Sequence, residues 1–159
     1  MHPVPDPSAR RAPTRTQAAQ STAFDGGEGI WLHEGVLFFS TKGDNRIWAY
    51  DVGSSMLTVL YDAASSPTPI LSGVDSLTVT TGGEVLVAED GGHMQIVAIA
   101  PDRSVYQLLQ VLGQPGSEIT GPAFDPSGQR LYFSSQRGSS RNPFAQAGIT
   151  YEVSGPFQT

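Results

Sequence analysis

The chain carries the apolar run Gly35-Val36-Leu37-Phe38-Phe39-Ser40 and repeats its pattern twice, as Glu84-Val85-Leu86-Val87-Ala88-Glu89 and Arg130-Leu131-Tyr132-Phe133-Ser134-Ser135. Val36 and Val85 are 49 residues apart, and Val85 and Leu131 are 46 residues apart. A strand-rich repeat with a period in the mid-forties is typical of the four-stranded blades of β-propellers. The run therefore indicates a repeat architecture.

Each repeat divides into the same parts. A first strand leads through a tight turn into the apolar run, which is the second strand; a polar loop and a third strand follow. We expect first strands at 29–33, 76–80 and 122–124, third strands at 46–51, 94–100 and 148–153, and fourth strands at 57–61 and 105–111. The third repeat ends at Thr159 before a fourth strand. The sequence predicts an all-β fold, a partial β-propeller of about three four-stranded blades whose last blade lacks its outer strand. A β-sandwich is the alternative, and the repeated order of turns argues against it.

The first 23 residues differ from the rest. They contain four prolines and three arginines, and they lack aromatic residues and an apolar period. Such a composition favours a disordered or loosely attached tail. We expect a tail at 1–23 and a propeller domain at 24–159.

Composition restricts the partners. The formal net charge is −6 and the isoelectric point is near 4.8. A general nucleic-acid or anionic-membrane surface is therefore not expected, whereas divalent cations suit the balance. The chain has no cysteine, which excludes disulfides and thiolate sites within it. These residues show no transmembrane run and neither a Sec nor a twin-arginine signal.

The repeat gathers acidic side chains at one end of the predicted channel. Strands within a blade are antiparallel, so the start of a first strand and the end of a second strand lie at the same end. The candidate metal ligands at these positions are Glu28, Asp75, Glu89, Asp90 and Glu118. Crowded carboxylates repel one another, and a bound cation relieves this repulsion. Oxygen ligands favour hard ions, with Ca²⁺ first. The alternative is that each acid is solvated or forms local turn hydrogen bonds.

One basic residue also belongs to this end. Arg137 follows the second strand of the third repeat. A guanidinium there can contact a phosphate oxyanion, or it can form a salt bridge with a neighbouring acid.

Four motifs resemble the C-terminal part of the PhoX-type alkaline phosphatase family. They occur in order as FDGGEGIW (24–31), STKGDNRIW (40–48), VAEDGG (87–92) and GSEITGPAFDP (116–126). The resemblance implies a six-bladed propeller, of which this chain is about half, and a calcium- and iron-dependent phosphomonoester hydrolase. It assigns Glu28 to a metal-ligand glutamate and places Glu89, Asp90 and Glu118 in acidic loops; full-length members are exported or periplasmic.

The chain departs from the family pattern at two places. Gly26 stands where catalytic members have an arginine, and the cysteine of the iron site is absent. Fe³⁺ is therefore expected only together with the missing N-terminal half, and the chain is expected to be truncated and inactive alone. A homodimer that closes the propeller is one way to complete it, since open sheet edges are aggregation-prone. Two other functions remain: a divalent-metal propeller lactonase, suited by Asp44-Asn45, and a non-enzymatic metal-stabilised scaffold.

Overall fold

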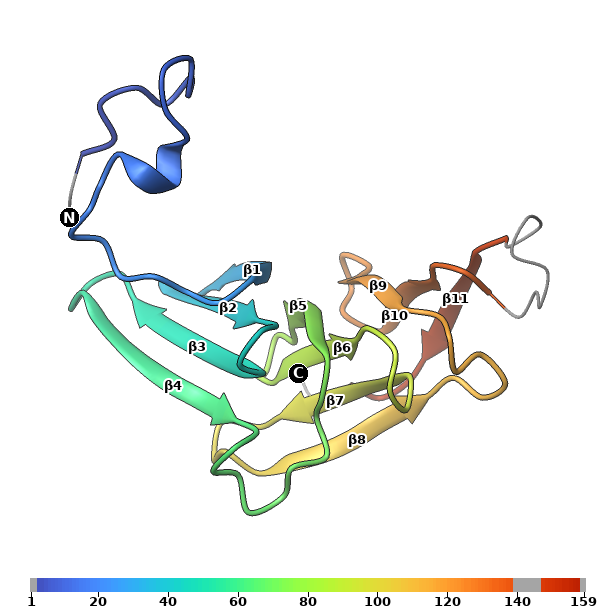
Figure 1. The fold of residues 1–159 in the computed structure, drawn as a ribbon. Helices are drawn as coiled ribbons and strands as arrows, with labels where there is room; N and C mark the ends of the chain where they lie inside the picture. The colour runs from blue at the N-terminus through green and yellow to red at the C-terminus, as the bar shows by residue number, and fades with distance from the viewer. Residues whose placement is uncertain (1–2, 139–146, 158–159) are drawn as a thin grey trace.

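The computed structural model describes residues 3–138 and 147–157. It contains three antiparallel sheets that follow one another along an arc (Figure 1). The first sheet has the order β1-β2-β3-β4, the second β5-β6-β7-β8 and the third β11-β10-β9. The strands are β1 (Gly27–His33), β2 (Val36–Thr41), β3 (Arg46–Asp51), β4 (Met56–Asp62), β5 (Val74–Val79), β6 (Val85–Glu89), β7 (Gln95–Ile99), β8 (Val105–Gln110), β9 (Ile119–Phe124), β10 (Arg130–Ser135) and β11 (Ile149–Ser154).

The predicted fold class is confirmed. The described residues form two four-stranded blades and a third blade of three strands, which is a partial β-propeller. The first strand of each sheet lies on the inner side of the arc, where β1 contacts β5 and β5 contacts β9 (Figure 1). Most of the predicted polar loop at 136–148 lies outside the described residues.

All three first strands begin earlier than predicted, and β9 begins at Ile119 rather than at 122. β1 begins at Gly27 and β5 begins at Val74, so Glu28 and Asp75 lie within strands rather than before them. In both strands the pairing is interrupted by a β-bulge and resumes on its far side. The bulge adds a residue that the apolar alternation does not reveal, which is why the pattern alone placed these strand starts too late.

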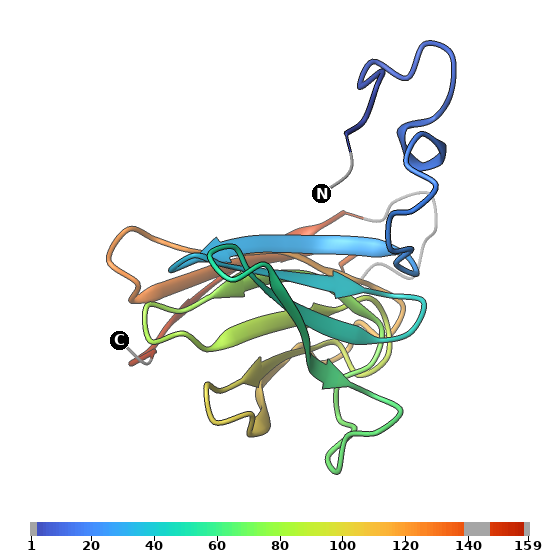
Figure 2. The same ribbon diagram turned by 90° about the vertical axis from the view of Figure 1, so that its left-hand side faces the viewer.

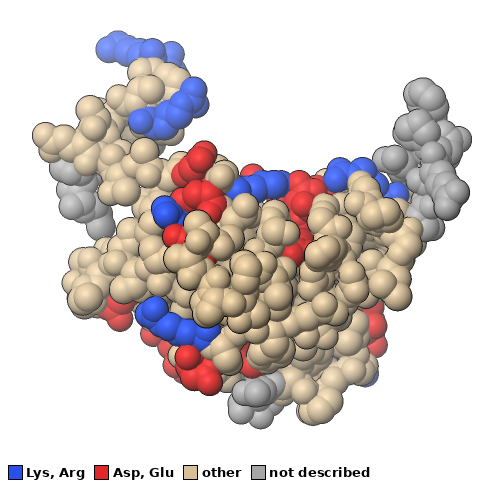
Figure 3. Space-filling model, turned by 60° about the horizontal axis from the view of Figure 1, so that its bottom comes forward, with Lys and Arg blue, Asp and Glu red and all other residues tan. Residues whose placement is uncertain are grey.

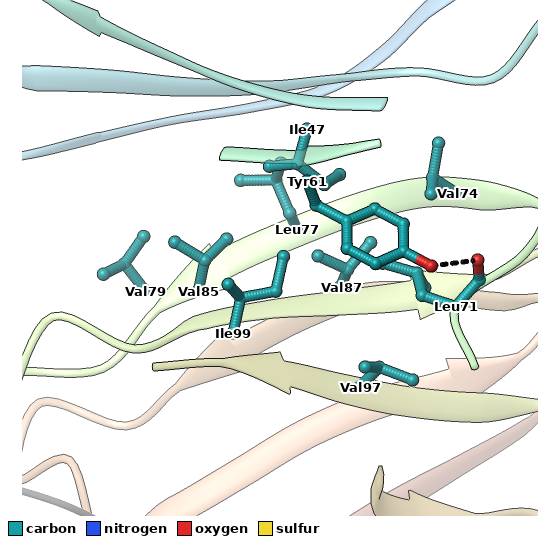
Figure 4. Close-up of a cluster of buried hydrophobic side chains, with 10 residues drawn as sticks. All are labelled: Ile47, Tyr61, Leu71, Val74, Leu77, Val79, Val85, Val87, Val97 and Ile99. Atoms are coloured by element: carbon teal, nitrogen blue, oxygen red, sulfur yellow. Dashed lines mark hydrogen bonds between the residues drawn. The ribbon is translucent and has the colours of Figure 1, made fainter. Parts of the chain in front are cut away.

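Alternation along the central strands builds two cores. In β6, Val85 and Val87 belong to the core between the first and second sheets, whereas Leu86 and Ala88 belong to the core between the second and third sheets. Successive side chains of a strand point to opposite faces, so a strand with neighbours on both sides must be apolar throughout. Figure 4 shows the first of these cores, in which the Tyr61 hydroxyl donates to the Leu71 carbonyl at 3.0 Å.

The N-terminal segment stands away from the sheets (Figures 1 and 2). It contains one short 3₁₀ helix, η1 (Thr14–Thr16). The Gln17 side chain accepts from the Asp6 N–H at 2.7 Å and donates to the Asp6 carbonyl at 2.8 Å. No helix in the described part of the chain is long and apolar enough to cross a membrane.

Candidate functional site

Three carboxylates from two neighbouring blades approach one another at one end of the inner strands, and we call them the acidic cluster: Asp75, Asp90 and Glu118. Asp75 lies at the start of β5, Asp90 directly follows β6, and Glu118 directly precedes β9. Asp90 and Glu118 form an isolated antiparallel bridge between the second and third blades. The topology therefore brings together side chains that are up to 43 residues apart in the sequence.

A close approach between β1 and β5 fixes the position of Asp75. A Cβ atom on Gly29 would lie 2.7 Å from the Asp75 carbonyl oxygen, so only glycine fits there. The Ser40 hydroxyl accepts from the Gly29 N–H at 2.8 Å and donates to the Asp75 carbonyl at 2.6 Å. One buried hydroxyl thus joins the first two blades beside the cluster.

Two basic side chains, one from the first blade and one from the third, form ion pairs with the acidic cluster. Lys42, from the β2–β3 loop of the first blade, contacts Asp90 and lies 3.2 Å from Asp75 Oδ2 through its Nζ. Arg137, which follows β10, reaches Asp90 Oδ1 at 3.4 Å and Glu118 Oε2 at 3.8 Å. All three described blades therefore contribute charged groups, three negative and two positive. Figure 3 shows acidic and basic side chains lying next to one another on one face of the molecule.

The Arg137 guanidinium is held by backbone as well as by acids. Its Nε donates to the Gly116 carbonyl at 2.8 Å, and its backbone N–H donates to Ser117 Oγ at 2.9 Å. Ser117 Oγ lies 2.6 Å from Ser135 Oγ, and both serines are buried. The predicted position of Arg137 at this end of the channel is thus observed, in the salt-bridged arrangement.

The surroundings of the cluster raise the pKa values of Glu118 and Lys42. Burial raises the pKa of the Glu118 carboxyl, and the negative charges of Asp90 and Asp75 raise it further. The hydrogen bond to Asp90 raises the pKa of the Lys42 ammonium, with Asp75 adding to it. With three carboxylates against two basic side chains, the group of charges has one more acidic than basic member.

Two of the predicted ligands lie outside the cluster. Glu28 is exposed in β1 and forms no ion pair with any described residue. Glu89 is fully buried, where it accepts from the Ser72 N–H at 3.0 Å and from the Gln95 N–H at 3.1 Å. Burial raises the pKa of Glu89. Its carboxylate joins the segment before β5 to the start of β7.

The Asp44-Asn45 pair is also committed to local contacts. Asn45 Oδ1 accepts from the Val74 N–H at 3.3 Å, which ties the first blade to β5. Asp44 pairs with Arg46 at 3.1 Å. Neither side chain forms an ion pair or hydrogen bond with the acidic cluster in the described structure.

Lys42 was not among the site residues predicted from the sequence. In the repeat alignment Lys42 and Arg137 occupy the same position, two residues beyond Ser40 and Ser135. The equivalence was visible in the sequence, and it predicts that both cations reach the same end of the channel.

The donor chemistry of the cluster suits a hard cation, because it consists of carboxylate oxygens. Within residues 3–138 and 147–157, however, no three Asp, Glu or His groups are close enough together to hold a metal ion. Lys42 lies between Asp75 and Asp90 and provides the positive charge there. The donors fit calcium in kind, and Lys42 competes for them.

The sheets and their converging strands define the class, a partial β-propeller. No protein-family model and no curated protein sequence matches the chain. Among solved structures, a luciferin-regenerating enzyme matches with a TM-score of 0.60 and 23% identity, over 86% of this chain and 47% of that one. The calcium-binding protein regucalcin from Agrobacterium tumefaciens matches with a TM-score of 0.56 and 17% identity, over 83% and 41%.

A protein of unknown function from Bacteroides thetaiotaomicron matches with a TM-score of 0.57 and 16% identity, over 74% of this chain and 28% of its own. The chain thus spans less than half the length of each of these three structures. At such identities the likeness establishes the propeller fold alone.

Proposed function

We propose that the chain is a segment of a β-propeller hydrolase whose active centre forms at the acidic cluster with a divalent cation, calcium first. One observation carries the proposal: three carboxylates of two blades converge at the channel end, where two basic side chains pair with them. Regucalcin, a structural neighbour, is described as calcium-binding, which supports the same choice of ion.

Asp75, Asp90 and Glu118 are the residues that would hold the ion, and Lys42 would have to leave the two aspartates. A divalent ion in such a place supplies Lewis acidity and lowers the pKa of a bound water. Arg137 stays beside the cluster through its bond to the Gly116 carbonyl. It is placed to bind a substrate oxyanion. Iron remains a prediction of the PhoX resemblance, and the chain itself offers no thiolate for it.

Two substrate classes follow from different observations. The first class is a small ester or lactone, as in the divalent-metal propeller lactonases that the sequence left as an alternative; its support is the propeller fold shared with a luciferin-regenerating enzyme and a calcium-binding protein. The basic pair Lys42 and Arg137 favours a phosphate monoester, in agreement with the PhoX resemblance, since both side chains are common ligands of phosphoryl oxygens. We place the lactone or ester first.

Calorimetric titration of Ca²⁺ into the chain tests the site. We expect Asp90→Asn to weaken binding by about tenfold or more, since it removes a charged ligand that contacts both cations. Asp125→Asn is the matched control. Asp125 is a half-buried turn residue that accepts from the Gln129 N–H at 3.1 Å and has no contact with the cluster, so Asp125→Asn leaves the cluster intact. Equal affinities for the two variants would remove the site.

Turnover assays separate the substrates. A lactone and a chromogenic phosphate monoester are each incubated with the chain, with Ca²⁺ and with a chelator. Calcium-dependent turnover of the lactone supports the first class, and turnover of the phosphate ester supports the second. If neither reacts while Ca²⁺ still raises the melting temperature, the chain is a metal-stabilised scaffold and the hydrolase proposal fails.

A further inference from the structure

A pocket of about 490 Å³ lies between the segment that joins β4 to β5 and the outer strands β7 and β8 of the second blade (Figure 1). We call it the glutamine pocket, after the polar residues that line it: Ser72, His93, Gln95, Gln107 and Gln110. Both of its walls belong to residues that the structure describes, so the pocket needs no further blade to form. Its volume falls within the range of small-molecule sites.

The Gln95 carboxamide is a buried polar group of this pocket. Gln95 is 4% exposed, and its carboxamide forms no hydrogen bond with any residue in 3–138 or 147–157. Two residues along β7, Val97 belongs to the core between the first and second sheets, so the alternation of the strand turns Gln95 to that same side, where the pocket lies. Buried polar groups are nearly always hydrogen-bonded. The carboxamide therefore points to an occupant that supplies hydrogen bonds.

A β-bulge in β8 brings two more carboxamides to the pocket. Gln110 pairs with Gln95 and Gln107 pairs with Val97, with a register shift between the two pairs. In a regular strand, residues three apart lie on opposite faces. The bulge cancels that offset and turns both glutamines to the same face. Three carboxamides from two strands thus converge on one pocket.

Hydrogen bonds hold the walls of the glutamine pocket in place. Glu89 is fully buried and accepts from the backbone N–H groups of Ser72, at 3.0 Å, and Gln95, at 3.1 Å. One carboxylate therefore ties the segment before β5 to β7. Gln110 Nε2 donates to the His93 carbonyl at 2.9 Å, which fixes the side chain of Gln110. The polar groups of the pocket are thus preorganised.

The lining determines the class of ligand. No Asp, Glu, Lys or Arg lines the pocket, and Pro69 and Ile70 provide an apolar wall. A charged ligand would lose hydration there without gaining an ionic partner. Carboxamides, an imidazole and a hydroxyl offer both donors and acceptors, and so do the hydroxyls of a ligand. The complementary molecule is neutral, with several hydroxyls on a compact carbon frame.

We propose that the glutamine pocket binds a neutral polyol of the size of one sugar ring. Hydroxyls of the ligand satisfy the Gln95 carboxamide, and the apolar wall covers its C–H groups. Water competes for the same carboxamides in an open pocket, so we expect a dissociation constant of about 1 mM. No residue of the acidic cluster lines the pocket, so this site is separate from the proposed metal centre.

NMR titration of the ¹⁵N-labelled chain tests the proposal. Glucose, galactose and mannose are the probes, since they differ in the orientation of single hydroxyls. We expect at least one of them to shift the side-chain amide signals of Gln95, Gln107 and Gln110 to saturation. Glucuronate, which adds a carboxylate to the same ring, and cyclohexanol, which keeps one hydroxyl, should bind at least about tenfold more weakly.

Two variants and a control assign the binding to the pocket. Gln107→Leu, at an exposed position, should weaken sugar binding by about fivefold, the loss of one hydrogen bond. Gln129→Leu, exposed in the β9–β10 turn outside the pocket, should leave it unchanged. Gln95→Leu should abolish binding without lowering the melting temperature of the sugar-free chain, because an apolar side chain of similar size replaces a buried carboxamide that lacks a partner within the described residues.

Other outcomes overturn the proposal. The absence of saturable shifts with all three sugars means that the pocket holds water only. Cyclohexanol or glucuronate binding as tightly as the sugars excludes a neutral polyol as the ligand. Equal losses in Gln107→Leu and Gln129→Leu place the binding elsewhere. A lowered melting temperature in Gln95→Leu shows that the carboxamide has a partner in the free protein. The sugar titration is made without calcium, so its failure and the failure of the metal site are separate results.

Discussion

The first and second sheets are built from the same four-strand unit but differ in how much of each is covered. Every residue of β6 and β7 is buried, because the second sheet has a neighbour on each face. Strand β1 occupies the inner edge of the first sheet and has no buried residue. The burial of a strand in a propeller blade therefore depends on the presence of adjacent blades. The pairing of strands within the blade is independent of those neighbours.

The largest contrast is expected from one substitution made in both sheets. Ile96 in β7 is fully buried, and Ile30 in β1 is 65% exposed. We expect Ile96→Ala to lower the free energy of unfolding by about 2–5 kcal/mol, because it leaves a cavity in a packed core. Ile30→Ala should change the free energy of unfolding by less than about 0.5 kcal/mol. Urea denaturation measures both, and comparable losses would contradict the exposure that the structure gives Ile30.

The repeat allowed the strands and their order to be predicted from sequence, because the turns and apolar runs recur with one spacing. It also predicted that Asp75, Asp90 and Glu118 meet. Glu89 was predicted as a channel ligand, whereas the structure buries it, as it buries its repeat equivalents Ser40 and Ser135. The serines at this position in two repeats indicate a buried hydrogen-bonding position. The charge of Glu89, in the remaining repeat, does not reveal that its side chain is buried.

Glu28 was misplaced for a different reason. The β-bulge in β1 shifts the side-chain alternation by a residue, and a bulge leaves no period in the sequence. The exposure of Ile30 and Leu32 could not be predicted either, since an apolar side chain in a strand reads the same whether a neighbouring blade covers it or not.

A smaller contrast is expected between the two glutamates. Glu89→Gln keeps the size of the side chain but replaces one acceptor oxygen by an NH₂ group, which leaves the Ser72 or the Gln95 N–H without its partner. We expect a loss of about 1–3 kcal/mol in the free energy of unfolding, the cost of an unsatisfied buried donor. Glu28→Gln, at an exposed position, should be neutral within about 0.5 kcal/mol. Equal effects in urea denaturation would contradict the structural role given to Glu89.

The smallest expected effect is a change with pH in the stability difference between wild type and Glu89→Gln. Burial raises the pKa of Glu89 above its ordinary value of 4.5, so folding disfavours the charged form. A carboxyl of this kind contributes most stability below its unfolded pKa and loses that contribution as pH rises through its folded pKa. Carboxyls with a lowered pKa, such as Asp51 and Asp125, act in the opposite sense but are common to both proteins and cancel in the difference.

The stability advantage of wild type over Glu89→Gln should therefore widen as pH falls from neutrality toward 4.5. Urea denaturation of both proteins at a series of pH values measures this difference. An advantage that narrows on acidification would mean that the ionised carboxylate is the form stabilised in the fold. The two N–H donors of Ser72 and Gln95 would then outweigh the desolvation that the second sheet imposes on Glu89.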